Sequence, residues 1–423
     1  MKKNTSSQNR MDLIDKTNPN STTSENWLKM RNNDSDLTHL MVIPESLLGS
    51  HSHWGPVIQD TKMKELGQDI ANNTSVKDLS LHPNFYDETT PSPHEDDIER
   101  KRQNFLLICD GLHNNQSIEK LHLHGTIIQF LLQFLTPFLM QSTNVLQEIT
   151  LGKCELGHEE INLFATCLIS REVPLDKLTL IGVEEGINEL ALAFHDNPGL
   201  FPKKFYATLL NRIIGLDECT SMAHLLQDSR CTMEELSIMP SNKSYFRIRD
   251  DRPIVFANAL AGNETLYKLD LGYFFPRYML DVFLQIICNS STINSTYTSN
   301  HTLCEIEDYH SAGPGCAQLS QYLHMNSDND KKAVARHKVL RHHFSGHFSM
   351  MEFKGMEPEL LMLSLIFLDK WGAEYNYGAH HQVARHSILF HLIKSAPMTV
   401  VAQTEVSQDT EISRPSKRIR ASG

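Results

Sequence analysis

A short hydrophobic pattern recurs along the chain: an apolar residue, two variable residues, Leu or Ile, one further residue, and then Leu, Ile or Val. It is clear in TSVKDLSL after Asn73, QSIEKLHL after Asn115 and ETLYKLDL after Asn263. Apolar and polar positions alternate in its second half, which predicts a β-strand in each copy. The first apolar residues of the visible copies are Leu37, Val76, Ile118, Leu146, Leu175, Met233, Leu266 and Leu303.

The spacing of these copies indicates a repeat protein. Successive first residues lie 39, 42, 28, 29, 58, 33 and 37 positions apart. Because 58 is twice 29, a degenerate copy is expected inside the widest gap, and PKKFYATLLN at residues 202–211 occupies that place. We therefore predict about nine repeats of a unit of 28–29 residues that insertions lengthen in places.

A segment with helical periodicity follows most copies of the pattern. Strand, helix and strand at short spacing predict right-handed crossovers and a parallel sheet. Neither element can bury its apolar face alone, so stacked repeats are expected to share one continuous core. The clearest helical segments are residues 158–172, 186–197, 219–229, 252–263 and 276–287.

The best copy runs from Leu146 through Ile149, Leu151 and Cys154 to Leu156. This spacing matches LxxLxLxx(N/C)xL, and over residues 33–310 the chain resembles the ribonuclease-inhibitor-like (RNI-like) leucine-rich-repeat family. The resemblance implies an α/β horseshoe with a parallel sheet on the concave face, and protein recognition in place of catalysis. Other copies depart from the pattern, which implies irregular loops: the Asn/Cys position holds Thr126, Val183, Ser241, Phe274 and Ser311.

Composition divides the chain into four predicted parts. Residues 1–25 are rich in Asn, Ser and Thr and are predicted to be a disordered tail, and residues 26–310 form the solenoid. Within the solenoid, residues 83–99 are an acidic, Pro-containing insertion and residues 289–299 a polar one, both predicted to be loops.

Residues 311–396 are predicted to be a helical C-terminal cap, because the end of a solenoid exposes core unless it is covered. Its helices are expected at 328–344, with Asp328 or Asn329 as N-cap, at 356–371 and at 379–393. A separate effector-binding helical domain is the alternative. Residues 397–423 are predicted to be a disordered basic tail.

Charge and motifs narrow the function classes. The 423 residues carry 39 Lys and Arg against 51 Asp and Glu, a net charge of −12, which disfavours nucleic-acid binding. The longest apolar stretch, residues 126–140, is too short for a membrane span, and the N-terminus lacks the apolar core of a secretory signal. Eight cysteines without a CxxC pair indicate reduced thiols. We therefore expect an intracellular monomer, cytoplasmic or nuclear.

Common catalytic and cofactor motifs are missing from the sequence, namely GxxxxGK[ST], GxGxxG, GxSxG and HExxH. We therefore expect no enzyme activity, no cofactor and no metal. The 22 histidines, although clustered after residue 337, are interpreted as solvated or packed side chains and not as zinc ligands. Asn-x-Ser/Thr triplets precede several strands, and we interpret their Asn residues as closing the preceding helix or turn in left-handed geometry, not as glycosylation sites. These are Asn33, Asn73, Asn115, Asn263 and Asn300.

Alternation along the strands predicts which side chains face the concave surface. Mixed charge with exposed aromatic residues is typical of a protein-binding rim. The predicted function is a non-catalytic scaffold that binds an unidentified protein partner. A substrate adaptor for a ubiquitin ligase or signalling enzyme is the runner-up, and a purely structural array is a third possibility. The candidate partner-binding residues are His82, Lys120, His122, His124, Glu148, Lys177, Glu235, Lys268, Asp270, Tyr273, Glu305, Glu307 and Tyr309.

The C-terminal tail reverses the acidic character of the chain. Lys417, Arg418 and Arg420 form a K-R-x-R sequence that is typical of a short nuclear import signal. Such a signal would bind a nuclear import receptor through an extended segment, and Pro415 favours extension of the residue before it. An ordinary solvated basic terminus is the alternative.

Overall fold

The computed structural model describes residues 11–15, 23–44, 56–81, 95–125, 128–141, 145–152, 156–210, 212, 214–241, 252–272, 277–307, 314–343 and 362. The chain divides into two compact units: Met1–Ile286 with Thr302–Ser327, and Ile287–His301 with Asp328–Gly423. The basic tail and the predicted helices at 356–371 and 379–393 lie outside the described residues, except for Met362.

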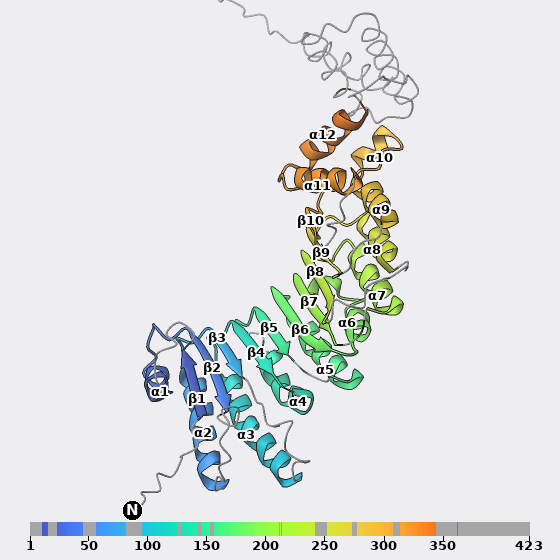
Figure 1. The fold of residues 1–423 in the computed structure, drawn as a ribbon. Coiled ribbons are helices and arrows are strands. Elements are labelled where there is room, and N and C mark those ends of the chain that lie inside the picture. The colour runs from blue at the N-terminus through green and yellow to red at the C-terminus, as the bar shows by residue number, and fades with distance from the viewer. Residues whose placement is uncertain are drawn as a thin grey trace, which may run out of the picture. The chain divides into compact units, whose positions relative to one another are not determined.

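Unit 1 contains one ten-stranded sheet whose strands follow one another in chain order (Figure 1). Strands β2 to β10 are parallel to their neighbours, and β1 pairs antiparallel with β2. The prediction of repeated strand–helix units around a parallel sheet is therefore confirmed. The strands are β1 (Met11–Asp15), β2 (His39–Pro44), β3 (Asp78–Leu81), β4 (Lys120–His124), β5 (Glu148–Gly152), β6 (Lys177–Val183), β7 (Lys204–Leu209), β8 (Glu235–Pro240), β9 (Lys268–Asp270) and β10 (Glu305–Ile306).

A helix separates most successive strands, and α2 to α8 lie along one face of the sheet (Figure 1). The helical segments expected from periodicity are confirmed to within a few residues at each end. The helices are α1 (Thr23–Arg31), α2 (Pro56–Asn72), α3 (Glu95–Asn114), α4 (Ile128–Leu139), α5 (His158–Ile169), α6 (Ile187–Ala193), α7 (Leu216–Gln227), α8 (Arg252–Leu260), α9 (Arg277–Ile287) and α11 (Pro314–Asn326).

Four elements lie wholly or partly in segments that were predicted to lack regular structure. Strand β1 and the start of α1 fall within residues 1–25, and α3 begins at Glu95, inside the acidic insertion. The short helix α10 (Ile293–Tyr297) lies inside the polar insertion at 289–299. Its N-cap is Thr292, whose hydroxyl accepts a hydrogen bond from the N–H of Ser295.

The core lies between the sheet and the helices. One apolar residue from each of β2 to β10 occupies the same register position, and each is no more than 2% exposed. Burying a side chain of this size contributes about 1.5–3 kcal/mol. This row is Leu40, Leu79, Leu121, Ile149, Leu178, Phe205, Leu236, Leu269 and Ile306.

The degenerate copy at residues 202–211 forms a complete strand. β7 pairs with both neighbours along its whole length. Its core positions hold Phe205 and Ala207 where other copies have Leu, and the Phe205 ring packs edge-on against Phe201 at 5.4 Å. The Phe201 ring in turn meets Phe194 at 5.1 Å, so aromatic packing takes the place of the leucines.

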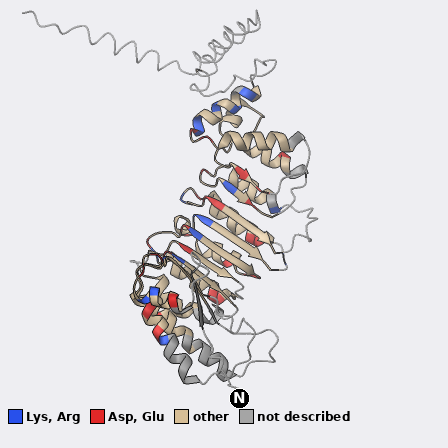
Figure 2. Ribbon diagram, turned by 60° about the vertical axis from the view of Figure 1, so that its left-hand side comes forward, with Lys and Arg blue, Asp and Glu red and all other residues tan. Residues whose placement is uncertain are grey.

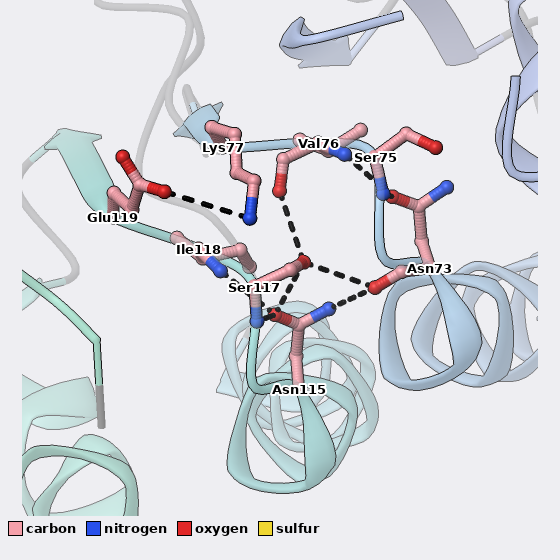
Figure 3. A network of polar contacts seen from close by, with 8 residues as sticks. All are labelled: Asn73, Ser75, Val76, Lys77, Asn115, Ser117, Ile118 and Glu119. Carbon is pink, nitrogen blue, oxygen red and sulfur yellow. Dashed lines mark hydrogen bonds and ion pairs between the residues drawn. The ribbon is translucent and has the colours of Figure 1, made fainter. Parts of the chain in front are cut away.

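Buried asparagines connect three repeats to the repeats before them. The Asn115 amide donates to the carbonyl of Asn73 at 2.8 Å (Figure 3). It also donates to the carbonyl of Ile70 at 2.6 Å. Its side-chain oxygen accepts the N–H groups of Ser117 and Ile118 at 2.8 and 3.0 Å. The side-chain oxygen therefore supplies the acceptor that these two buried N–H groups would otherwise lack.

The same arrangement recurs at Asn73, which donates to Met30 at 2.7 Å, and at Asn263, which donates to Leu226 at 2.8 Å. The predicted left-handed geometry is wrong for these asparagines: among described non-glycine residues, only Asn33 has a positive φ, of 53°. Asn is required at these positions because its side-chain amide donates to one repeat while its side-chain oxygen accepts from the next. Its tolerance of left-handed backbone conformation is not used.

Backbone hydrogen bonds align the strand starts in the same way. The carbonyl of Lys77 accepts the N–H groups of both Glu119 and Lys120, at 2.8 and 2.9 Å. The carbonyl of Glu119 then accepts those of Gln147 and Glu148, at 2.7 and 3.0 Å. This repeated pattern sets the register in which each strand enters the sheet.

Helices α2 and α3 approach each other closely at two glycines. A Cβ on Gly67 would lie 2.2 Å from the Leu107 carbonyl oxygen, and one on Gly111 would lie 2.2 Å from the Gly67 carbonyl oxygen. Only glycine permits this separation of the two backbones.

In unit 2, α12 (Lys331–His343) contains a fully buried lysine. The Lys338 ammonium donates to the carbonyls of Ile287 and Asn300 at 2.6 and 3.1 Å. It also lies 3.1 Å from Nδ1 of His301, and burial, with the Lys338 charge, lowers the pKa of His301 to about 4. This histidine is therefore neutral at neutral pH, and its Nδ1 can accept a hydrogen bond from the Lys338 ammonium.

The N-cap of α12 differs from the prediction. Asp330 accepts the N–H of Ala333 at 2.9 Å, so it caps the helix in place of Asp328 or Asn329. The Asp328 carboxylate instead accepts the N–H of Asp330 at 3.0 Å, which forms the turn before the helix.

We predict that Asn115→Ala lowers the free energy of unfolding by about 2–4 kcal/mol, because it removes hydrogen bonds to two buried carbonyls and leaves two buried N–H groups without their acceptor. Urea unfolding followed by circular dichroism measures this. The neighbouring Asn114→Ala is the control, since Asn114 is exposed and donates only to Asp110 of its own helix. Equal losses in the two variants would contradict the role of Asn115.

Candidate protein-binding face of the sheet

One face of the sheet packs against the helices and the core. The opposite face, which carries the alternating strand side chains that point away from the core, is the open face. In β4, Lys120, His122 and His124 are partly exposed and alternate with the buried Leu121 and Leu123. The first residue of each strand from β2 to β10 lies in register with the first residue of the next, which forms a row across the sheet, the first row. It comprises His39, Asp78, Lys120, Glu148, Lys177, Lys204, Glu235, Lys268 and Glu305.

Every member of the first row is ionisable. Figure 2 colours Lys and Arg positions blue and Asp and Glu positions red along the ribbon. Ion pairs across neighbouring strands join Lys120 to Glu148, Lys204 to Glu235 and Lys268 to Glu305. Lys120 donates to Glu148, and this hydrogen bond raises the pKa of Lys120. Lys268 pairs with Glu305 at 3.0 Å and also binds Glu307, and the hydrogen bond from Lys268 lowers the pKa of Glu307. Cross-strand pairs of opposite charge stabilise the sheet.

Glu235 is the centre of the densest cluster on the open face. Lys204 lies 2.5 Å from Oε1 of Glu235, and Tyr206 and Tyr267 donate their phenol hydroxyls to the same carboxylate. Burial opposes ionisation of Glu235, but the three hydrogen bonds outweigh it and lower its pKa to about 2. Burial, reinforced by the carboxylate, raises the pKa of Tyr206 to about 12. The cluster therefore holds both tyrosine rings in fixed positions.

Lys177 is bound differently from the other first-row lysines. Its ammonium lies 5.0 Å from the centroid of the Tyr206 ring, a cation–π contact. It makes no ion pair with any residue that the structure describes. Its neighbours in register are Glu148, which Lys120 engages, and Lys204, which Glu235 engages.

Histidines gather at the N-terminal part of the open face. Asp78 lies between His39 and His122, with nitrogen–oxygen distances of 3.8 and 3.3 Å. The His124 ring lies against Gly152 of the next strand, where a Cβ would stand 2.2 Å from its Nδ1. Glycine at this position therefore makes room for the imidazole.

The third residue of each strand from β2 to β9 forms a second row in register, and this row buries polar groups at its β8–β9 end. It comprises Met41, Ser80, His122, Thr150, Thr179, Tyr206, Ser237 and Asp270. Asp270 is only 2% exposed; it accepts a hydrogen bond from Ser237 at 3.0 Å and another from the N–H of Gly272 at 2.9 Å. Asp270 therefore stabilises the β9 end and presents little surface to a partner.

The structure brings most of the predicted partner-binding residues to the open face on neighbouring strands. Lys120, Glu148, Lys177, Glu235, Lys268 and Glu305 share the first row, and His122 and Asp270 share the second. His82, Tyr273 and Tyr309 lie outside the described residues, as do Lys417, Arg418 and Arg420 of the predicted import signal.

Three residues of the central cluster were not predicted. Lys204 and Tyr206 belong to β7, whose copy of the pattern was too degenerate for its open-face positions to be assigned. Tyr267 directly precedes β9 and reaches Lys204, 63 residues away, through its hydroxyl at 3.5 Å. For Lys204 and Tyr206, the one feature of the sequence that could have located them was the spacing of the repeats, which predicted a strand at residues 202–211.

The described part of the chain offers no group of three or more His, Cys, Asp and Glu side chains that could hold a metal ion. None of its helices combines the length and apolar character that a membrane span needs. No protein-family model matches the sequence, and no curated protein shows a significant match to it.

We predict that Glu235→Gln lowers the free energy of unfolding by about 1–3 kcal/mol at pH 7, since Lys204 loses its counter-charge. The folded-state pKa of about 2 lies below the ordinary 4.5, so the carboxylate contributes stability above about pH 4.5 that is lost as the pH falls toward 2.

The difference between the variant and the parent should therefore shrink over that pH window, which denaturant unfolding at a series of pH values measures. Glu234→Gln is the matched control, because no ion pair of Glu234 is seen among the described residues. A difference that stays constant with pH would contradict the assignment.

Proposed function

We propose that this chain is a non-catalytic recognition scaffold that binds a protein partner on the open face of its sheet. The observation that carries the proposal is the first row, a continuous line of ionisable side chains across nine strands with Tyr206 and Tyr267 fixed beside it. Tyrosines and charged groups held in place in advance reduce the conformational entropy lost on binding.

We further infer that the repeats are leucine-rich repeats of the RNI-like type, with the open face on the concave side of a horseshoe. The match of Leu146, Ile149, Leu151 and Leu156 to the repeat pattern supports this, because all four are buried in the described structure. The in-register buried row from β2 to β10 supports it as well. Repeat proteins of this kind present a long surface to one partner.

A face that recognises proteins should be detectable by site-specific photo-crosslinking. We predict that a photoreactive amino acid at Thr208, on the open face of β7, captures a protein from cell extract. The same group at Asn162, an exposed position of α5, is the control and should capture nothing specific. Capture at Asn162 alone, or no capture at either Thr208 or Thr150, would contradict the proposal.

A further inference from the structure

The charges of the open face do not cancel evenly, and the excess charges have fixed positions. Lys120 and Glu148 neutralise each other, as do Lys204 and Glu235 at 2.5 Å. What remains in the central and C-terminal part of the first row is Lys177 on β6 and the group around Lys268 on β9 and β10.

Lys177 is an uncompensated positive charge on a rigid platform. Its ammonium lies 5.0 Å from the centroid of the Tyr206 ring, and Tyr206 is itself held by its hydrogen bond to Glu235. Glu148, the nearest carboxylate in register, already binds Lys120. An anion could therefore bind the Lys177 ammonium without first breaking an ion pair within the described structure.

The β9–β10 end carries the opposite excess. Lys268 is a single cation between two carboxylates, Glu305 at 3.0 Å and Glu307. The two carboxylates are about half exposed, with side-chain exposures of 51% and 42%, so a partner can reach them. With Asp270 of β9 also beside Glu307, carboxylates outnumber the single cation, and this end carries an excess of negative charge.

The two excess charges are separated by a defined length. From β6 to β10 there are four steps between neighbouring strands, and at about 4.8 Å per step this is about 19 Å. An extended peptide advances about 3.3 Å per residue, so about six residues cover the same length.

We propose that the partner contributes an extended segment that crosses the strands, with an acidic side chain at Lys177 and a basic side chain, about six residues away, at Glu305 and Glu307. This inference rests on the proposed protein-binding function. Opposite charges at the two ends allow only one direction of the segment, because the reversed segment would place like charges together.

Direct selection of peptides tests the proposal without knowledge of the natural partner. The probe is a phage-displayed library of random dodecapeptides selected on the full chain, and synthetic copies of the enriched peptides are then measured by fluorescence anisotropy. Enriched peptides should share Asp or Glu and, about six positions away, Lys or Arg. Selection that enriches no acidic residue, or no peptide at all, overturns the proposal.

Variants of the chain identify the contact. Lys177→Gln should weaken binding of the enriched peptides about tenfold, a typical loss for a charge pair at an interface, and Glu305→Gln with Glu307→Gln should do likewise. Lys64→Gln, which removes an exposed lysine of α2, is the matched control and should leave affinity unchanged. Lys177→Gln removes the cation–π contact with Tyr206 but no ion pair within the described structure, so its free energy of unfolding should fall by no more than about 1 kcal/mol.

Changing the acidic residue of the peptide to Gln should cost the parent chain the same affinity and cost the Lys177→Gln chain nothing more. If both changes weaken binding independently, Lys177 does not meet that residue and the proposal fails. Capture of a partner at Thr208 that Lys177→Gln leaves intact would likewise refute this inference while the proposed function still stands.

Discussion

The register of the parallel strands is the constraint on which the open face depends. In a strand, a shift of one residue would exchange the buried row for the charged row. Asn73, Asn115 and Asn263 fix the approach to their strands by bonding the preceding repeat with the amide and their own repeat with the oxygen. Because these groups are buried, an alternative register would leave them without partners at high cost.

Register also explains how the charges of the first row coexist. Opposite charges face each other from β4 to β5, from β7 to β8 and from β9 to β10. The exception is the neighbouring pair Lys177 and Lys204, which would repel each other directly. Glu235 neutralises one of them, and the Tyr206 ring faces the other. These contacts reduce the repulsion between the two lysines and leave the Lys177 ammonium available to a partner.

The sequence was sufficient to place the repeated strands and helices, because periodic Leu and Ile residues mark their buried faces. It predicted the open-face positions of β4, β5, β6, β8, β9 and β10 for the same reason. Lys204 and Tyr206 were missed because Phe205 and Ala207 replace the leucines that define the pattern. Tyr267 and the buried Lys338 act across long sequence separations that no local pattern reports. The asparagines were located correctly, but their role depends on side-chain partners in another repeat.

Labelling of carboxyl groups by carbodiimide, read by mass spectrometry with and without the captured partner, tests the central claim most directly. If the open face binds the partner, labelling of Glu305 and Glu307 should fall, while Glu159 on α5 and Asp217 on α7, both exposed, should keep theirs. Protection of Glu159 and Asp217 with unchanged labelling of Glu305 and Glu307 would place the partner on the helices and contradict the account.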